Sequence, residues 1–250
     1  LDAQRFEPNL HNRSFIVLSD AMESQKGWMG SLTFNHARNP LIYRVDQVDR
    51  TDIRVVGNVW TSDWMGGYTF GRWSVGAHMP LHLYASGDNA SRFALLGDMR
   101  LIGHYVLADR RDSTVGWSTT AHLGLPTGNK ELWLRQSGPS GAMTVNAASG
   151  ERIVGAANLG VSIIKPVSLD GLDFGTAMTW RMGVHVPIQS RFWASLEVDA
   201  EHHLASLDHA GANPVELHGY GRMEIPDNWM LTIGGATAIS KGIGAPEYSC

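Results

Sequence analysis

Histidines and charged residues recur at every second position in several stretches of this chain, and such side chains can bind metals, transfer protons or select ions. In "FWASLEVDAEHHL", Glu197, Asp199, Glu201 and His203 share one face of an extended chain, and most apolar residues take the other. Most of the 11 histidines lie on the polar face of such runs: His78, His82, His104, His122, His185, His203 and His218. One hypothesis is that these histidines form a metal-binding or proton-transfer site. The alternative is that they are among the mixed polar side chains that fill a narrow barrel interior.

The charged residues on the polar faces form a second candidate site. They carry both signs and come from several runs: Arg54, Asp98, Arg100, Arg181, Glu197, Asp199, Glu201, Glu216, Arg222 and Glu224. Opposite charges on adjacent strands can pair. One hypothesis is a charge-selective constriction. The other, which the near balance of acid and base favours, is a set of ion pairs that plugs the interior.

The sequence gives little support to catalysis. It contains no G-x-S-x-G, no H-E-x-x-H and no P-loop. The outward-facing His36 and His202 have no serine partner at the same height, and His202 and His203 point to opposite faces. The one cysteine, Cys250, excludes an internal disulfide and a Cys-rich metal site. We therefore predict no enzyme activity, no cofactor and no metal.

Period-two alternation of polar and apolar residues predicts that the chain is all-β. The predicted strands span residues 28–37 with a continuation to 45, then 53–69, 73–84, 98–108, 114–125, 142–148, 152–164, 174–188, 192–204, 215–225 and 229–240. Short turns and long loops alternate between them, which is typical of an antiparallel up-and-down barrel with one tight rim. Asn39-Pro40 interrupts the first strand and predicts a bend where that strand leaves the hydrocarbon layer.

The composition of the two faces favours a barrel in a membrane over a soluble β-rich domain. Charged residues make up 18% of the chain, less than the ~25% of an average soluble domain. The apolar face carries aromatic residues near strand ends, as in the girdles of membrane barrels: Trp28, Trp73, Trp117, Phe174, Phe192 and Trp229. A net charge of -4 gives no reason to expect nucleic-acid binding.

Six short motifs occur in order along nearly the whole chain: "AQRFEP", "GSLTFNHARNPLIYR", "PLHLYASGD", "LGDMRLIGHYVL", "LGLPTGN" and "GIGAPEYS". With these motifs the chain resembles the N-terminal transmembrane β-barrel of OmpA-family outer-membrane proteins of Gram-negative bacteria. The resemblance implies the bacterial outer membrane and a structural or porin-like role. Similar sequences add one more strand after "GAPEY", so we expect about twelve strands, the last starting near Glu247 and cut short.

The expected organisation is an N-terminal segment, residues 1–26, followed by the barrel, residues 27–250. The segment has one short apolar stretch, Phe15 to Leu18, and it either plugs the lumen or lies along the periplasmic rim. A C-terminal peptidoglycan-binding domain, common in the resembled family, is absent from this sequence.

The expected function is a structural outer-membrane barrel that supports a cell-envelope assembly, with a lumen plugged by paired charges. A diffusion porin for small solutes and a soluble β-rich binding domain are the alternatives. The partners that the resemblance implies are outer-membrane lipid and lipopolysaccharide. Peptidoglycan, through the missing domain, and other envelope proteins are further candidates.

Overall fold

The computed structural model describes residues 8–10, 14–45, 51–88, 91–129, 138–169, 172–208, 213–226, 229–240 and 248–249. The side chains of residues 41–45, 51–55, 169, 172–173 and 248 lie outside this description.

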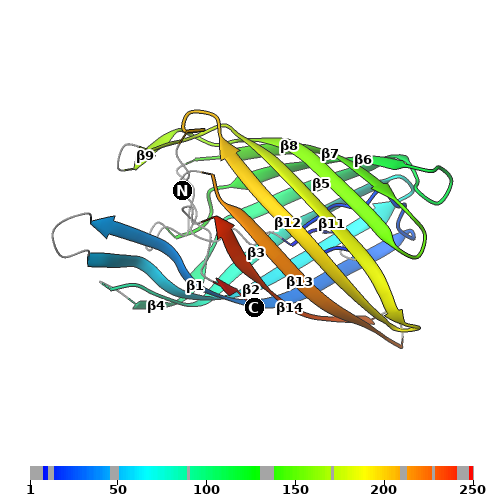
Figure 1. The fold of residues 1–250 in the computed structure, drawn as a ribbon, viewed down its shortest axis with the longest axis horizontal. Coiled ribbons are helices and arrows are strands. Elements are labelled where there is room, and N and C mark those ends of the chain that lie inside the picture. The colour runs from blue at the N-terminus through cyan, green and yellow to red at the C-terminus, as the bar shows by residue number, and fades with distance from the viewer. Residues whose placement is uncertain are drawn as a thin grey trace.

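The described chain is an antiparallel, up-and-down β-barrel, which confirms the predicted fold class. Its wall follows the chain order β1 (Gly27–Val45), β2 (Thr51–Phe70), β3 (Trp73–Ser86), β5 (Met99–Ala108), β6 (Gly116–Leu125), β7 (Ser140–Ser149), β8 (Val154–Ile163), β11 (Ala177–Gln189), β12 (Phe192–His203), β13 (Val215–Ile225) and β14 (Trp229–Ser240). Figure 1 shows these strands wrapping obliquely around a common axis.

The short strand β15 (Tyr248–Ser249) joins the two ends of the sheet. Ser249 pairs with Ala37 of β1 on one side and with Ala236 of β14 on the other. Since β2 pairs with both β1 and β3, the order of strands returns to its start. The expected twelfth strand is therefore present as these two residues, and the sheet edge is paired there.

Alternation along each strand decides which side chains face inward. On β12, Leu196 is 50% exposed on the outer face, and the neighbouring Glu197 is 0% exposed on the inner face. The same pattern on β3 buries His78 and His82 and leaves Met79 and Leu83 on the outside. On these strands the outer face is thus apolar and the inner face polar.

Three short strands inside the long connections were not predicted as separate elements. β4 (Ser91–Leu96) pairs with the end of β3, and β9 (Val167–Leu169) forms a small hairpin with β10 (Leu172–Phe174). Phe174, assigned from the sequence to the outer aromatic girdle, is instead buried and lies edge-on to the ring of His203 at 5.0 Å. Strands this short offer too few alternating positions to be recognised from the sequence.

The interruption at Asn39-Pro40 is a bulge within one long strand. The register between β1 and β2 shifts between Arg38 and Leu41. Asn39 has a φ of 52°, a left-handed conformation that asparagine tolerates better than most residues. The strand therefore bends and then resumes pairing, as the sequence predicts.

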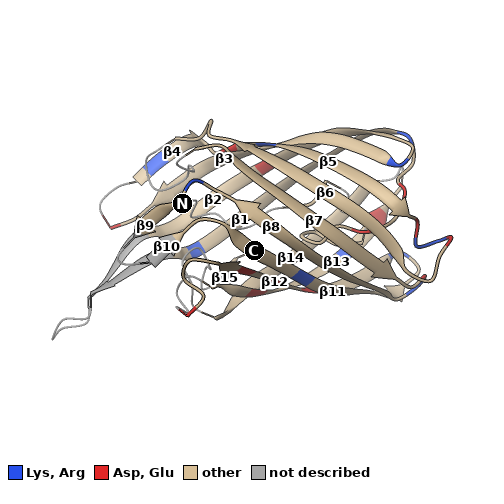
Figure 2. Cartoon of the chain, turned by 90° about the horizontal axis from the view of Figure 1, so that it is seen from above, with Lys and Arg blue, Asp and Glu red and all other residues tan. Residues whose placement is uncertain are grey.

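The two rims differ in size. One rim consists of the turns after β2, β5, β7, β11 and β13, and the other carries the long connections, the extensions of β1 and β2 and the β9–β10 hairpin (Figure 1). Uncharged residues dominate the strands between the rims (Figure 2). No helix in the described ranges is long and apolar enough to cross a membrane.

Candidate functional site in the barrel lumen

An N-terminal segment of the chain itself occupies the barrel interior. Residues 14–21, here called the lumen segment, are all buried although none of them belongs to a strand. Phe15, Leu18 and Ala21 are 0% exposed. The segment runs inside the barrel and leads to the start of β1 at the short-turn rim (Figure 1). The lumen segment therefore occupies part of the barrel interior.

Glu197 holds the centre of the lumen segment. The backbone N–H of Ile16 donates to Oε1 of Glu197 at 2.8 Å, and those of Val17 and Leu18 donate to Oε2 at 2.9 and 3.1 Å. Hydrogen bonds to a charged acceptor are about twice as strong as neutral ones. These three N–H groups have no backbone acceptor within the described part of the chain, because the segment is neither a strand nor a helix. The carboxylate of Glu197 on β12 accepts their hydrogen bonds instead.

Asn158 on β8 binds the next part of the lumen segment through both atoms of its amide. The N–H of Ser19 donates to Oδ1 of Asn158 at 2.8 Å, and Nδ2 of Asn158 donates to the carbonyl of Ser19 at 3.0 Å. The hydroxyl of Thr120 on β6 donates to that of Ser19 at 3.1 Å. The amide of Asn158 thus binds both the N–H and the C=O of Ser19, as the backbone of a paired strand would.

Apolar side chains of the lumen segment pack against the wall. Phe15, Leu18 and Ala21 form one cluster with Ala148, Val154 and Ala156 of β7 and β8. On the other side, Ile16 and Val17 pack with Tyr220 of β13. Apolar burial of this kind contributes about 25 cal/mol per Å². The packing therefore adds to the hydrogen bonds in retaining the segment.

An ion pair fixes the lumen segment at the short-turn rim. Nε of Arg110 donates to Oδ1 of Asp20 at 2.9 Å, and both side chains are less than 10% exposed. Nη1 of Arg110 also donates to the carbonyl of Gly150 at 2.7 Å, which ties the β5–β6 turn to the β7–β8 turn. A Cβ on Gly116 would come within 2.8 Å of the carbonyl of Ala21, so glycine lets the segment leave the lumen here.

A second clamp holds the chain just after the lumen segment. Oδ2 of Asp109 accepts from the N–H of Glu23 at 2.9 Å, and Nη2 of Arg111 donates to the carbonyl of Glu23 at 3.2 Å. Burial acts to raise the pKa of Asp109, but hydrogen bonds from Arg111 and from two backbone N–H groups lower it to about 2. The carboxylate in turn raises the pKa of Arg111. This pair lies in the turn between β5 and β6.

The opposite wall holds a separate polar cluster. Nε2 of His78 lies 2.8 Å from Oδ1 of Asp63, and the other oxygen of Asp63 accepts from the amide of Asn35. Nδ1 of His82 lies 3.0 Å from the hydroxyl of Thr61. All five side chains are buried. They join β1, β2 and β3 by side-chain hydrogen bonds on the inner face.

The residues predicted to line the lumen lie largely on the inner face. Those less than 10% exposed are His78, His82, Asp98, His104, His185, Glu197, Asp199, His203, Glu216, His218 and Arg222. Arg100, His122, Arg181 and Glu201 are half-buried, Glu224 is exposed near the end of β13, and the side chain of Arg54 lies outside the described residues.

The set contains an ion pair of the kind predicted, between opposite charges on adjacent strands. Nε of Arg181 lies 2.5 Å from Oδ1 of Asp199 on the adjacent strand. Two further contacts join residues of the same strand: His203 lies 3.7 Å from Glu201 on β12, and His218 lies 3.7 Å from Glu216 on β13. Glu197 instead binds backbone N–H groups of the lumen segment. The interior is thus filled by a chain segment together with ion pairs.

Arg222 is a buried charged residue whose guanidinium has no hydrogen-bond partner among the described residues. Its side chain is 2% exposed, and no described residue lies within hydrogen-bonding reach of its Nε, Nη1 or Nη2. It projects inward from β13, where its backbone pairs with Trp193 of β12. Glu197 is the carboxylate that interacts with it electrostatically. A buried charge without hydrogen-bond partners is costly.

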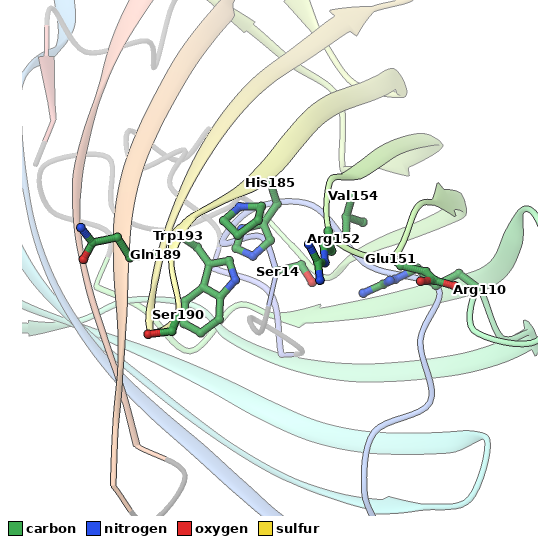
Figure 3. A pocket seen from close by; sticks show the side chains of 10 residues that line it. Ser14, Arg110, Glu151, Arg152, Val154, His185, Gln189, Ser190 and Trp193 are labelled. Atoms are coloured by element: carbon green, nitrogen blue, oxygen red, sulfur yellow. The ribbon is translucent and has the colours of Figure 1, made fainter.

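A pocket of about 400 Å³ opens at the short-turn rim beside the lumen segment. Figure 3 shows Arg110, Arg152, His185 and Trp193 around it, with Ser14 on the side of the lumen segment. The hydroxyl of Ser195 donates to the carbonyl of Ser14 at 3.0 Å, so the 2.8 Å contact with Nδ1 of His185 has the histidine as donor. A histidine in this role does not act as a general base toward that serine.

Apart from Glu197 and Arg181, sequence reasoning missed the hydrogen-bond partners of the lumen segment. Asn158, Ser118, Thr120 and Arg110 make contacts with it, and none of them stands in a recognisable motif. The one usable signal is the apolar stretch Phe15 to Leu18 within an otherwise polar segment.

Within the described residues, no three His, Cys, Asp or Glu side chains are arranged to hold a metal ion. No protein-family model and no curated protein matches this chain.

Proposed function

We propose that this chain is a structural β-barrel of the bacterial outer membrane whose lumen is closed by its own N-terminal segment. The observation that carries the proposal is the inverted polarity of the closed sheet. Leu159, Leu196 and Ile233, from three strands, expose 57%, 50% and 72% of their surface on the outer face. Exposed apolar surface of this extent requires lipid or a partner to cover it.

Two belts of aromatic residues support a membrane position. Trp28, Phe70, Trp73, Trp117 and Trp229 lie exposed at strand ends beside the short-turn rim. Trp60, Tyr84 and Phe93 lie toward the other rim. Along β2 and β3 the belts are roughly 33 to 36 Å apart at 3.3 Å per residue. A strand tilt of about 40° reduces this to about 25 to 28 Å, which matches the ~25 Å apolar band of outer-membrane barrels.

The structural role, rather than free diffusion, is supported by the filled interior. The lumen segment, its contacts with Glu197 and Asn158, and the Arg181–Asp199 pair occupy the space that a porin leaves to water. The resemblance to the barrels of the OmpA family points to the same role. Outer-membrane lipid and lipopolysaccharide are then the surroundings of the wall, and other envelope components are its proposed partners.

Folding into lipid vesicles tests the membrane assignment with two matched variants. Leu196 is 50% exposed on β12, and Leu207 is 59% exposed in the connection that follows β12. Leu196→Arg places a charge in the apolar band, which costs ~2–4 kcal/mol near the bilayer midplane. Leu207→Arg makes the same change outside the wall.

We expect Leu196→Arg to reduce strongly the fraction of protein that inserts and shows heat-modifiable gel mobility. Leu207→Arg should insert like the original protein. Equal insertion of the two variants would contradict the membrane assignment. Folding of the original protein without detergent or lipid would favour a soluble β-rich domain.

A further inference from the structure

We propose that the inner wall of the barrel is a binding site for a bent peptide segment, that the lumen segment is its resident ligand, and that departure of this segment opens the lumen. The proposal rests on the proposed function only for its conductance measurement.

The wall recognises the main chain of its ligand. Glu197 accepts three consecutive N–H groups, and Asn158 binds both the N–H and the carbonyl of Ser19. The hydroxyls of Ser195 and Ser118 donate to the carbonyls of Ser14 and Asp20 at 3.0 and 3.1 Å. Contacts of this type recognise a peptide by its backbone, and the packing of Phe15 and Leu18 in an apolar cluster with the wall supplies selectivity.

The ligand is attached without becoming part of the sheet. The hydrogen bonds described above between the wall and residues 14–20 all use wall side chains, whereas the backbone N–H of Arg110 donates to the carbonyl of Ala21 at 3.0 Å. Residues 14–26 take part in no strand pairing. Water can replace each of these hydrogen bonds, and their net contribution in a protein is only about 1 kcal/mol each, more where the partner is charged. The segment can therefore leave without disrupting the barrel ladder.

Arg222 opposes the bound state. While the lumen segment is in place, Glu197 is occupied by backbone N–H groups and Arg222 has no hydrogen-bonding partner among the described residues. Both project inward from neighbouring strands. Once the segment leaves, the carboxylate of Glu197 is free to accept hydrogen bonds from the guanidinium of Arg222. The charge-assisted pair of Glu197 and Arg222 then offsets the loss of the hydrogen bonds to the segment. The interior therefore has two alternative arrangements, one with the segment bound and one with the two side chains paired.

The base of the lumen segment is held more firmly than its middle. Arg110 binds Asp20 at the rim, and Asp109 binds the N–H of Glu23. Residues 14–19 are therefore the part that moves, with Asp20 as the pivot.

Thiol labelling of the full chain tests departure of the segment directly. In a Cys250→Ser background, Ser19→Cys places a thiol at a position that is 6% exposed. A large water-soluble maleimide can reach it only when the segment leaves. Ser190→Cys, in the exposed β11–β12 turn, reports the rate for a free thiol. We expect the thiol at position 19 to react completely, but at least tenfold more slowly than the thiol at position 190.

A disulfide can then lock the segment. The hydroxyls of Ser19 and Thr120 lie 3.1 Å apart, so Ser19→Cys with Thr120→Cys positions two thiols for bonding. The matched control joins two wall residues, Thr69→Cys with Ser74→Cys, whose hydroxyls lie 2.9 Å apart. In planar bilayers we expect stepwise conductance from the reduced lock variant, loss of these steps on oxidation, and no effect of oxidising the control.

Two further substitutions, each combined with Ser19→Cys, should shift the labelling rate at position 19 in opposite directions. Glu197→Gln leaves a neutral amide with one oxygen for three N–H groups, so labelling should accelerate at least tenfold. Arg222→Met removes the cation that pairs with Glu197 after departure, so labelling should slow at least threefold. A role of both residues in barrel stability alone would accelerate labelling in both variants.

A folded barrel whose thiol at position 19 stays unlabelled, while the thiol at position 190 reacts fully, would overturn the proposal. So would a conductance that oxidation of the lock variant leaves unchanged. If the protein fails to insert into bilayers, the proposed function fails, and the labelling in detergent still decides between a fixed and a departing segment.

Discussion

Gly76 shows how closely the wall approaches the residues inside it. A Cβ at this position would lie 2.7 Å from Cδ1 of Leu10 and 2.7 Å from the carbonyl of Gly66. Leu10 is held in place by its neighbour, since Nδ2 of Asn9 donates to the carbonyl of Leu18 at 2.6 Å. The absence of a side chain on β3 therefore makes room for the N-terminal residues.

Gly76→Ala should accordingly lower the stability of the barrel by about 1–3 kcal/mol through overpacking. Gly103 lies close by on β5, where a Cβ would meet nothing within 4 Å. Gly103→Ala should be neutral or should stabilise by up to about 1 kcal/mol, because alanine restricts the unfolded chain. Urea unfolding in detergent, followed by tryptophan fluorescence, measures both changes. Equal losses in the two variants would mean that contact with Leu10 does not limit the residue at position 76.

At the scale of elements, the turn between β5 and β6 does more than reverse the chain. Arg110 of this turn binds Asp20, and Asp109 and Arg111 bind the backbone of Glu23. These contacts hold the chain where it passes from the lumen to β1. The turn is thus the structural link between the wall and the segment inside it.

This link predicts a specific loss of stability in acid. The pKa of Asp109 is lowered from 3.8 to about 2 in the folded protein. The unfolded chain therefore takes up this proton more readily than the folded chain does. The stabilisation by Asp109 is complete above about pH 4 and is lost as the pH falls toward 2. The difference in unfolding free energy between the original protein and Asp109→Asn should shrink over that range, and a difference independent of pH would contradict the assigned role.

The whole molecule has one compact rim and one elaborated rim, and this asymmetry defines an orientation. The long connections contain trypsin sites such as Arg92, and the short-turn rim contains Arg110 and Arg111. We expect the long connections to face the cell exterior if the barrel lies in the outer membrane. The lumen segment then leaves the barrel on the periplasmic side.

Trypsin added to intact cells should therefore cut only in the connections 85–97 and 126–141, if it cuts at all. Permeabilising the outer membrane should expose Arg111, which is exposed at the rim. Peptide mapping of the fragments identifies each site. Cleavage confined to Arg110 and Arg111 in intact cells would reverse the orientation.

Local pattern alone determined the β class, the two faces of each strand and the alternation of short and long connections. These properties depend on a side-chain period of two and on turn residues, which can be read within about ten residues. Leu196 and Glu197 follow this rule, and the bend at Asn39 follows from its neighbouring proline. For the same reason, the inward position of most predicted lumen residues required no knowledge of the whole fold.

The partners of those residues were decided only by the tertiary structure. Ile16 and Glu197 are 181 positions apart, and they meet because the sheet closes around residues that precede its first strand. Glu197 and Arg222 looked like members of a balanced set of ion pairs, yet one binds backbone N–H groups and the other has no hydrogen-bond partner among the described residues. Charge and spacing show which groups face the interior, but the closed barrel and the segment inside it decide which atoms come within bonding distance.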